Sequence, residues 1–195
     1  MKNIDILMAG VGGQGTILAS NILTEVGLEL KYNVKKSEVH GMAQRGGTVE
    51  SHVRWGDEVH APLIEQGYAD YLIGFEMLET ARWPSYIKKG APVIINSYQI
   101  PPPSVNLGKA KYPSKEEIES ILTAAGGKVI WVEGTKIAEE LGNPAAAGVV
   151  LLGVVSNMLG GDEGIWQKVI QSLVPERFLE LNRKAFQAGR ALEVA

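Results

Sequence analysis

The residues with the greatest potential for chemistry lie in one short segment, residues 37–47. It combines hydroxyl, carboxylate, imidazole, amide and guanidinium side chains with glycines: Ser37, Glu38, His40, Gly41, Gln44, Arg45, Gly46 and Gly47. Polar side chains on a backbone that can turn tightly are typical of a loop that contacts a ligand or a partner. A glycine-rich connection with solvated polar groups is the alternative, because most loops carry no chemistry.

Two side chains of this segment are the candidates for catalysis. His40 can carry a proton near neutral pH or contact an anion, and it can equally tie the loop to itself. Arg45 can make a bidentate contact with a phosphate or carboxylate of a ligand, or with an acidic side chain of a partner. The remaining residues predicted to bind substrate or partner are Ser37, Glu38, Gln44, Gly46 and Gly47.

A second glycine cluster follows the apolar run of residues 4–9. Gly10, Gly12 and Gly15 have the G-x-G-x-x-G spacing, and residues 16–23 have the pattern of a helix. In such a strand–turn–helix unit, the N–H groups at the start of the helix can hold a phosphate. The predicted cofactor-binding residues are therefore Gly10, Gly12, Gly13, Gln14 and Gly15. The same glycines also allow a helix to pack closely on a sheet, which is the alternative.

The residues after the next predicted strand disfavour ordinary NAD binding. A dinucleotide site needs an acidic residue there to hold the ribose, but the strand around residues 32–34 runs into Lys35 and Lys36 before Glu38. The lysines suit a phosphate or an acidic partner, and equally a solvated strand end. Two alternatives stay open: an NAD- or NADP-dependent dehydrogenase, and a non-catalytic regulatory module that binds a nucleotide.

Composition limits which cofactors this chain can hold. It contains no cysteine, so it supplies no thiolate ligands for an iron–sulfur cluster. It also lacks the Gly-Asp-Gly start of the usual thiamine diphosphate motif. His40, His52 and His60 have neither the close spacing of a zinc pair nor a cysteine companion, so no metal site is predicted.

Charge and hydropathy also limit the partners. A net charge of −3 disfavours a nucleic-acid binder, which would normally carry a basic face. The longest apolar stretch, residues 145–155, is too short to span a bilayer. Because the N-terminus leads directly into a strand rather than a signal sequence, we expect a cytoplasmic protein without membrane association.

Strand and helix patterns alternate along the 195 residues, which predicts an α/β fold. Residues 1–195 are expected to form a single three-layer α/β/α, Rossmann-like domain. Its sheet should be mixed and mostly parallel, with one antiparallel hairpin in which residues 48–55 turn at Gly56-Asp57 and residues 58–60 return. Further strands are predicted at residues 71–75, 93–96 and 128–132, and helices at 76–87, 115–125, 144–158 and from 175.

Several packing features can be read from the same patterns. Gly148 and Gly153 reduce helix propensity in the helix 144–158, which predicts a close crossing with another backbone. The three prolines at 101–103 predict a stiff extended connection, either a spacer or a strap that binds a partner. The last helix should pack through one stripe of residues, Phe178, Leu181, Ala185, Ala188 and Leu192.

Taken together, these motifs resemble the gamma-type subunits of the 2-oxoacid:ferredoxin oxidoreductases, and the indolepyruvate type in particular. The segment 38–47 is the most specific part of the resemblance, which runs almost to residue 190. The other stretches that carry it are residues 10–15, 48–55, 100–103, 141–144, 149–153 and 181–186.

The resemblance implies a subunit of a complex that oxidatively decarboxylates a 2-oxo acid onto coenzyme A and passes the electrons to ferredoxin. It also implies that thiamine diphosphate, Mg and the iron–sulfur clusters lie on a larger partner subunit, through which ferredoxin is reached, and that this chain binds no cofactor by itself. A gamma subunit for pyruvate, 2-oxoglutarate or 2-oxoisovalerate is the alternative within the family. The segment 37–47 is expected at the subunit interface.

Overall fold

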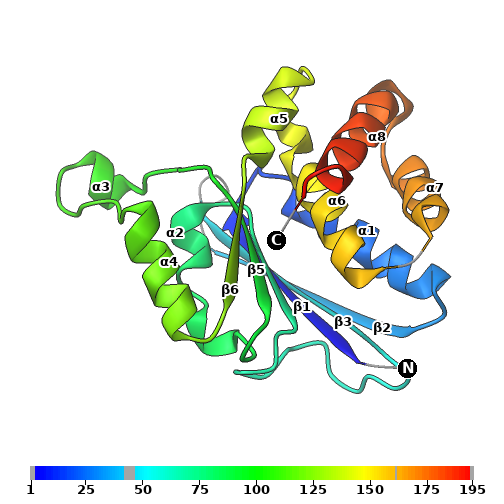
Figure 1. The fold of residues 1–195 in the computed structure, drawn as a ribbon, viewed down its shortest axis with the longest axis horizontal. Coiled ribbons are helices and arrows are strands. Elements are labelled where there is room, and N and C mark those ends of the chain that lie inside the picture. The colour runs from blue at the N-terminus through cyan, green and yellow to red at the C-terminus, as the bar shows by residue number, and fades with distance from the viewer. Residues whose placement is uncertain (1–2, 42–46, 161, 194–195) are drawn as a thin grey trace.

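A six-stranded sheet forms the centre of the molecule (Figure 1). The computed structural model describes residues 3–41, 47–160 and 162–193. The strands are arranged in the order β2-β3-β1-β4-β5-β6. Their bounds are β1 Ile4–Val11, β2 Asn33–His40, β3 Thr48–Gly56, β4 Tyr71–Gly74, β5 Pro92–Asn96 and β6 Lys128–Val132.

The sheet is mixed and mostly parallel, as predicted. Strands β1, β4, β5 and β6 pair in parallel, whereas β3 runs antiparallel to both of its neighbours, β1 and β2. The antiparallel hairpin is therefore formed by β2 and β3, and the predicted return strand at residues 58–60 is wrong. Because β1 and β2 already occupy both edges of β3, no edge is free for a third partner. Residues 37–40, predicted to be part of a loop, belong to β2.

Helices cover both faces of the sheet, which confirms the layered α/β architecture (Figure 1). One face carries α1 Thr16–Glu29, α5 Gly134–Glu140, α6 Ala147–Leu159, α7 Glu163–Leu173 and α8 Glu176–Arg190. The other face carries α2 Met77–Thr80 and α4 Lys115–Ala124. Alternate strand residues supply the two cores: Ile6, Met8, Ile73 and Ile94 point to the first, and Leu7, Leu72, Val93 and Ile95 to the second.

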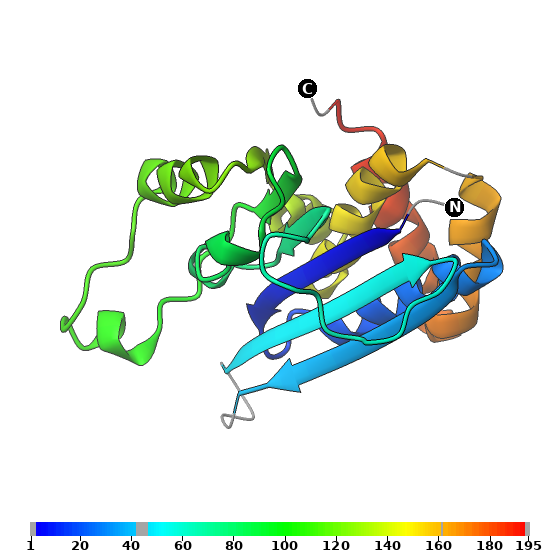
Figure 2. The same ribbon diagram turned by 90° about the horizontal axis from the view of Figure 1, so that it is seen from below.

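The second helical layer lies over β4–β6. Over β2 and β3 a connecting segment, residues 57–70, crosses instead (Figure 2). Its backbone is attached to side chains of β3, because Ile64 N donates to His52 Nδ1 over 3.2 Å. Arg54 Nη1 also donates to the carbonyls of Ala61 and Leu63 over 3.1 and 3.0 Å. These bonds keep residues 58–60 out of the sheet.

Local capping signals correctly predicted two helix starts. Ser114 and Glu117 form the predicted capping box at α4. Asn143 Oδ1 accepts from Ala145 N over 3.0 Å, and Pro144 begins a 3-10 turn, η2 Pro144–Ala146, that continues into α6. The helix predicted at 76–87 is wrong. It is reduced to α2 and a 3-10 turn, η1 Pro84–Tyr86, because Pro84 lacks the N–H that a continuing helix needs.

Helices α6 and α8 cross with their backbones in contact, as predicted for Gly153, whereas a Cβ on Gly148 would meet the ring of Phe75 at 2.8 Å rather than another helix. A Cβ on Gly153 would lie 2.2 Å from the carbonyl oxygen of Phe186, and one on Gly189 would lie 2.0 Å from that of Val150. This crossing sets which face of α8 is buried. Of the predicted stripe, Ala185 is buried, Ala188 is half-buried, and Leu181 and Leu192 pack partly buried against the first core, whereas Phe178 is exposed. The fully buried residues of α8 are Asn182, Ala185, Phe186 and Gly189.

Candidate functional site

A cavity of about 330 Å³ lies at the carboxyl ends of the parallel strands. The chain leaves β1 for β2 on one side, whereas β4 flanks β1 on the other, so the cavity lies where the strand order reverses. This is the usual ligand position in open α/β sheets. The lining residues are Gly12, Gly13, Gln14, Phe75, Asn96, Tyr98, Ile100, Thr135, Asn143, Pro144, Ala145 and Ala147.

The glycine cluster forms the predicted turn between β1 and α1, and part of it faces this cavity. Gly13 and Gly15 have φ angles of 100° and 79°, a region that favours glycine. Gly10 serves packing, since a Cβ there would lie 2.8 Å from the Cβ of Phe75. No side chain caps α1, so its first N–H groups are available to an anion. The cluster thus has features of both predicted alternatives, a close helix–sheet contact and an anion site.

The side chain of Gln14 braces the glycine turn. Its Oε1 accepts from Val11 N over 2.8 Å, and its Nε2 donates to the carbonyl of Phe75 over 2.9 Å. Both polar ends of this side chain are therefore engaged within the protein, although the residue lines the cavity. What the side chain of Gln14 does in this structure is to fix the shape of the turn.

Asn96 and Thr135 form a buried polar pair on the opposite wall. Asn96 Nδ2 donates to Thr135 Oγ1 over 2.8 Å and to the Phe75 carbonyl over 3.1 Å, while Thr135 N donates to Asn96 Oδ1 over 3.0 Å. Since Thr135 Oγ1 accepts from Asn96, its own proton can be donated to a ligand. Sequence reasoning missed both residues. A signal was present, because Asn96 is the polar residue that ends an otherwise apolar parallel strand.

The described lining of the cavity carries no carboxylate, lysine, arginine or histidine. The cavity is thus equipped to bind through amide, hydroxyl and backbone groups and through apolar contact. It offers no acid–base pair and no carboxylate for Mg²⁺. Across the part of the chain that the structure describes, no cluster of three His, Cys, Asp or Glu residues is arranged to hold a metal ion. Within that same part, no helix is long and apolar enough to cross a membrane.

The described residues of the predicted segment 37–47 do not lie in one loop. Ser37 and His40 lie in β2, opposite His52 and Val49 of β3. Glu38 Oε1 accepts from Ser20 Oγ over 2.6 Å and from Lys36 Nζ over 3.2 Å. Glu38 is therefore bonded to helix α1 and to its own strand. Gln44, Arg45 and Gly46 lie outside the described residues.

One contact brings the two glycine segments together. Gly12 N donates to the carbonyl of Gly47 over 2.9 Å, so the end of the segment 37–47 lies beside the glycine turn. Gly41 N in turn donates to the carbonyl of Thr48 over 2.8 Å and closes the base of the β2–β3 connection. Lys36, considered above as a phosphate contact, bonds with Glu38 and with Asn21 Oδ1. The binding roles predicted for this segment remain predictions.

The fold, the cavity and the glycine turn together define a known class. The chain belongs to the pyruvate ferredoxin/flavodoxin oxidoreductase family, whose model matches residues 5–192. The indolepyruvate oxidoreductase subunit IorB of Pyrococcus horikoshii is 40% identical to it over 193 residues, which cover 97% of this chain and 95% of that protein. The subunit of the same name from Archaeoglobus fulgidus is 40% identical over 188 residues, 95% of this chain and 93% of that protein.

A solved structure agrees with this assignment. The gamma subunit of a keto/oxoacid ferredoxin oxidoreductase from Geobacter sulfurreducens superposes with a TM-score of 0.69 at 26% identity, and the match covers 95% of each chain. The resemblance inferred from the sequence motifs is thereby confirmed, both in family and in extent.

Proposed function

We propose that this chain is the small, gamma-type subunit of a cytoplasmic 2-oxoacid:ferredoxin oxidoreductase of the indolepyruvate type. The observation that carries the proposal is the match at 40% identity, over almost the full length of both chains, to two subunits named for indolepyruvate oxidoreductase. More distant relatives, named for 2-oxoglutarate synthase and for pyruvate/ketoisovalerate oxidoreductases, are 26–29% identical. That difference favours an aryl pyruvate as the 2-oxo acid.

The residues present in this chain indicate which cofactors the other subunit must hold. A chain without cysteine cannot hold an iron–sulfur cluster through thiolates, and those cavity-lining residues that the structure describes include no carboxylate for the metal of a pyrophosphate. We therefore assign thiamine diphosphate, Mg and the clusters to a larger partner subunit. When bound there, thiamine diphosphate supplies the nucleophile and electron sink for decarboxylation. This chain contributes binding, orientation and exclusion of water.

We assign the cavity to coenzyme A. The uncapped start of α1 suits a phosphate, and the walls formed by Asn96, Thr135 and Tyr98 suit a chain that alternates amide and methylene groups. Thr135 has a hydroxyl proton to donate to such an amide. Arg45 and His40, which are predicted contacts, would act on the same ligand or on the partner.

The test is reconstitution. The purified chain, the larger subunit and their mixture are assayed with indolepyruvate, coenzyme A and a viologen acceptor, with pyruvate and 2-oxoglutarate as alternative substrates. We expect turnover only from the mixture, with the highest kcat/KM for indolepyruvate. Turnover by this chain alone would refute the subunit role. A mixture that prefers pyruvate or 2-oxoglutarate would refute the indolepyruvate type and leave the gamma-subunit role intact.

A further inference from the structure

Residues 97–114 form an arm that projects from the body of the molecule between β5 and α4 (Figure 1). All of these residues are described, and none of them is buried. The regular structure within the arm is a single short helix, α3 Pro103–Asn106. The outgoing part of the arm is extended at Pro102, with φ −69° and ψ 163°, and Pro103 is the first residue of α3.

A single buried carboxylate holds the base of the arm. Glu76 is 1% exposed, and its Oε1 accepts from Ile100 N over 2.9 Å and from the hydroxyl of Tyr112. Its Oε2 accepts from Glu79 N over 2.7 Å, and Tyr112 Oη accepts from Leu78 N over 3.1 Å. Burial, helped by Glu76, raises the pKa of Tyr112 above its ordinary value, so this hydroxyl stays a donor. The outgoing and returning parts of the arm therefore meet at one fixed point.

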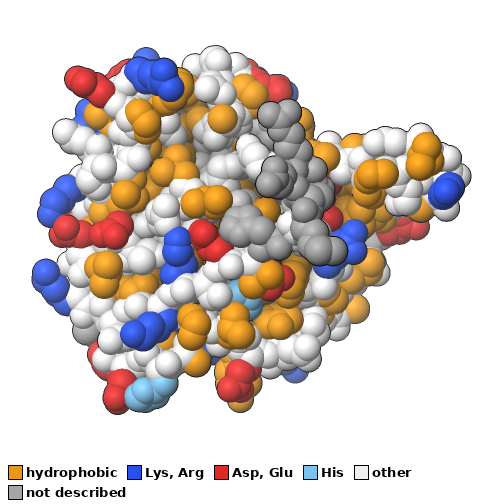
Figure 3. Space-filling view, turned by 180° about the vertical axis from the view of Figure 1, so that it is seen from behind, with side chains coloured by type: hydrophobic (Ala, Val, Ile, Leu, Met, Phe, Trp, Pro, Cys, Tyr) orange, Lys and Arg blue, Asp and Glu red, His pale blue; other side chains and the backbone are white. Residues whose placement is uncertain are grey.

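The exposed surface of the arm is apolar and basic. Leu107 at its tip is 69% exposed, which is the largest exposure among the large hydrophobic side chains of the described residues. The arm contains Lys109 and Lys111 and no acidic residue, although the whole chain has a net charge of −3. Neither lysine forms an ion pair with a carboxylate in the described part of the protein. Figure 3 shows the arm standing clear of the body, with hydrophobic side chains along it and a basic one near its tip.

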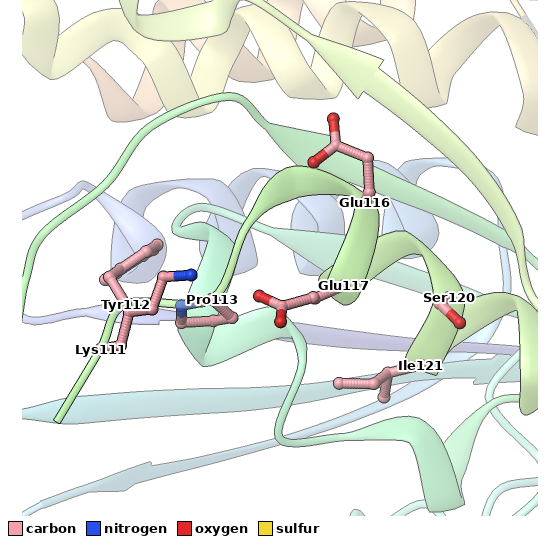
Figure 4. Close-up of a pocket in the computed structure, with 7 residues that line it drawn as sticks. All are labelled: Lys111, Tyr112, Pro113, Glu116, Glu117, Ser120 and Ile121. Carbon is pink, nitrogen blue, oxygen red and sulfur yellow. The ribbon is translucent and has the colours of Figure 1, made fainter.

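A groove of about 640 Å³ continues this surface between the returning part of the arm and helix α4 (Figure 4). Tyr112 and Pro113 lie on one side and Ile121 on the other. Two acids also line the groove, Glu116 and Glu117. Glu117 is engaged locally, because its Oε2 accepts from Ser114 N over 2.7 Å. The groove thus presents mainly apolar surface beside the lysines of the arm.

We propose that residues 97–114 are a docking arm for the larger subunit, with Leu107 as its apolar anchor and with Lys109 and Lys111 pairing with carboxylates around the pocket that receives it. This inference rests on the proposed function. The larger subunit is favoured over a second copy of this chain because the arm also forms the cavity wall, through Tyr98 and Ile100. A partner bound to the arm therefore lies beside the proposed coenzyme A site. The reaction needs the cofactors of the larger subunit at that place.

The experiment measures binding of the purified full-length chain to the larger subunit at low and high salt. Two independent variants are used, Leu107→Ser and the double change Lys109→Glu with Lys111→Glu. The matched controls are Leu63→Ser, at a side chain 53% exposed in the connection 57–70, and Lys89→Glu with Lys128→Glu, two exposed lysines away from the arm. Thermal melts check that every variant is folded.

We expect each arm variant to weaken binding by about tenfold or more, as for an interface anchor, and the controls to bind like the unchanged chain. The charge variant should also lose most of the salt dependence of binding. Equal binding by the arm variants and controls would overturn this inference and leave the proposed function standing. Failure of the unchanged chain to bind would refute the proposed function, and the docking arm with it. If the arm variants altered only self-association of the chain, the occupant would be a second copy, and the inference would be wrong.

Discussion

The carbonyl of Phe75 is the point at which the walls of the cavity are joined. It accepts from Gln14 Nε2 of the glycine turn and from Asn96 Nδ2 at the end of β5. Asn96 in turn bonds to Thr135 at the start of α5, so four segments that are distant in sequence share one network. Buried hydrogen-bond networks of this kind rigidify a site, and a single missing member leaves several groups unpaired.

We expect Asn96→Ala to lower the free energy of unfolding by about 1–3 kcal/mol, because Thr135 and Phe75 would then lose partners in a buried place. The measurement is urea unfolding of the isolated chain. Asn106→Ala is the matched control, since Asn106 is exposed and its Nδ2 donates only to the carbonyl of Pro101 over 3.1 Å. Similar losses in both variants would show that the network at Phe75 does not hold the cavity together.

His52 makes the stability of the chain dependent on pH. It is buried on β3, where its Nδ1 accepts from Ile64 N and its Nε2 lies 3.8 Å from Glu50 Oε1. Burial lowers its pKa below the ordinary value, and the charge of Arg54 adds to this effect. The unfolded chain takes up the proton near pH 6.5, about the ordinary pKa of histidine, and the folded chain only at lower pH. Stability is therefore full above that pH and falls as the pH drops toward the folded pKa.

The check is the melting temperature at about pH 7.5 and about pH 5.5, on either side of the ordinary histidine pKa. We expect His52→Gln to reduce the loss on acidification, because glutamine can accept from Ile64 N without titrating. His60→Gln is the control, since the side chain of His60 is 81% exposed. Glu50, whose pKa is raised by burial, stabilises the folded chain on acidification and so opposes the effect of His52. The pH response of each variant is therefore compared with that of the unchanged chain rather than with zero. An unchanged pH response in His52→Gln would contradict the assignment.

Asn96 and Thr135 are functional candidates that were not predicted from the sequence. The glycine spacing and the apolar run before it were enough to predict the turn that lines the cavity, because those signals are local. The partner of Asn96 lies 39 positions away, and no local pattern marks it. Similarly, Glu38 and Lys36 looked like free loop charges, whereas their partners Ser20 and Asn21 lie on the helix that packs against their strand.

At the scale of elements, the crossing of α6 and α8 is the tightest contact in the helical layer. We expect Gly153→Ala to destabilise the chain by about 1–3 kcal/mol or more, because its Cβ would meet the Phe186 carbonyl and force the helices apart. The measurement is the shift in the urea midpoint. Gly164→Ala in α7 is the control, since its Cβ would meet only the Asp162 side chain, at 3.2 Å, and alanine favours a helix. Equal midpoints would mean that the crossing can relax at little cost.

Element prediction succeeded where the signal was contained in neighbouring residues. The capping box of α4 is one such case. The Asn143-Pro144 start of η2, which continues into α6, is another. It failed for the hairpin. Gly56-Asp57 carries a good turn signal, but the choice of partner for β3 depends on β1, whose paired residues lie 37 to 51 positions earlier. It was incomplete for α8, because hydrophobic periodicity included the exposed Phe178 and does not encode the close approach to α6 that Gly189 allows.

At the scale of the whole molecule, both helical layers pack on one sheet, and strands β4 and β5 supply residues to both cores. We therefore expect one cooperative thermal transition, with equal calorimetric and van't Hoff enthalpies, as for a single domain. Differential scanning calorimetry of the isolated chain is the measurement. Two resolved transitions would contradict the prediction of one domain over residues 1–195 and would mark the α6–α8 layer or the arm as a separate unit.

The position of α6, α7 and α8 has a consequence for how the protein is made. The face of the sheet that bears Ile6, Met8 and Ile94 is covered in part by α1, whereas much of the rest is covered by helices that lie between Ala147 and Arg190. During synthesis, all six strands are made before α6, α7 and α8, so the apolar strand surface that these helices cover stays open until they have been added. Completion of the first core therefore waits for α8, and a nascent chain halted before α6 is a natural client for a chaperone.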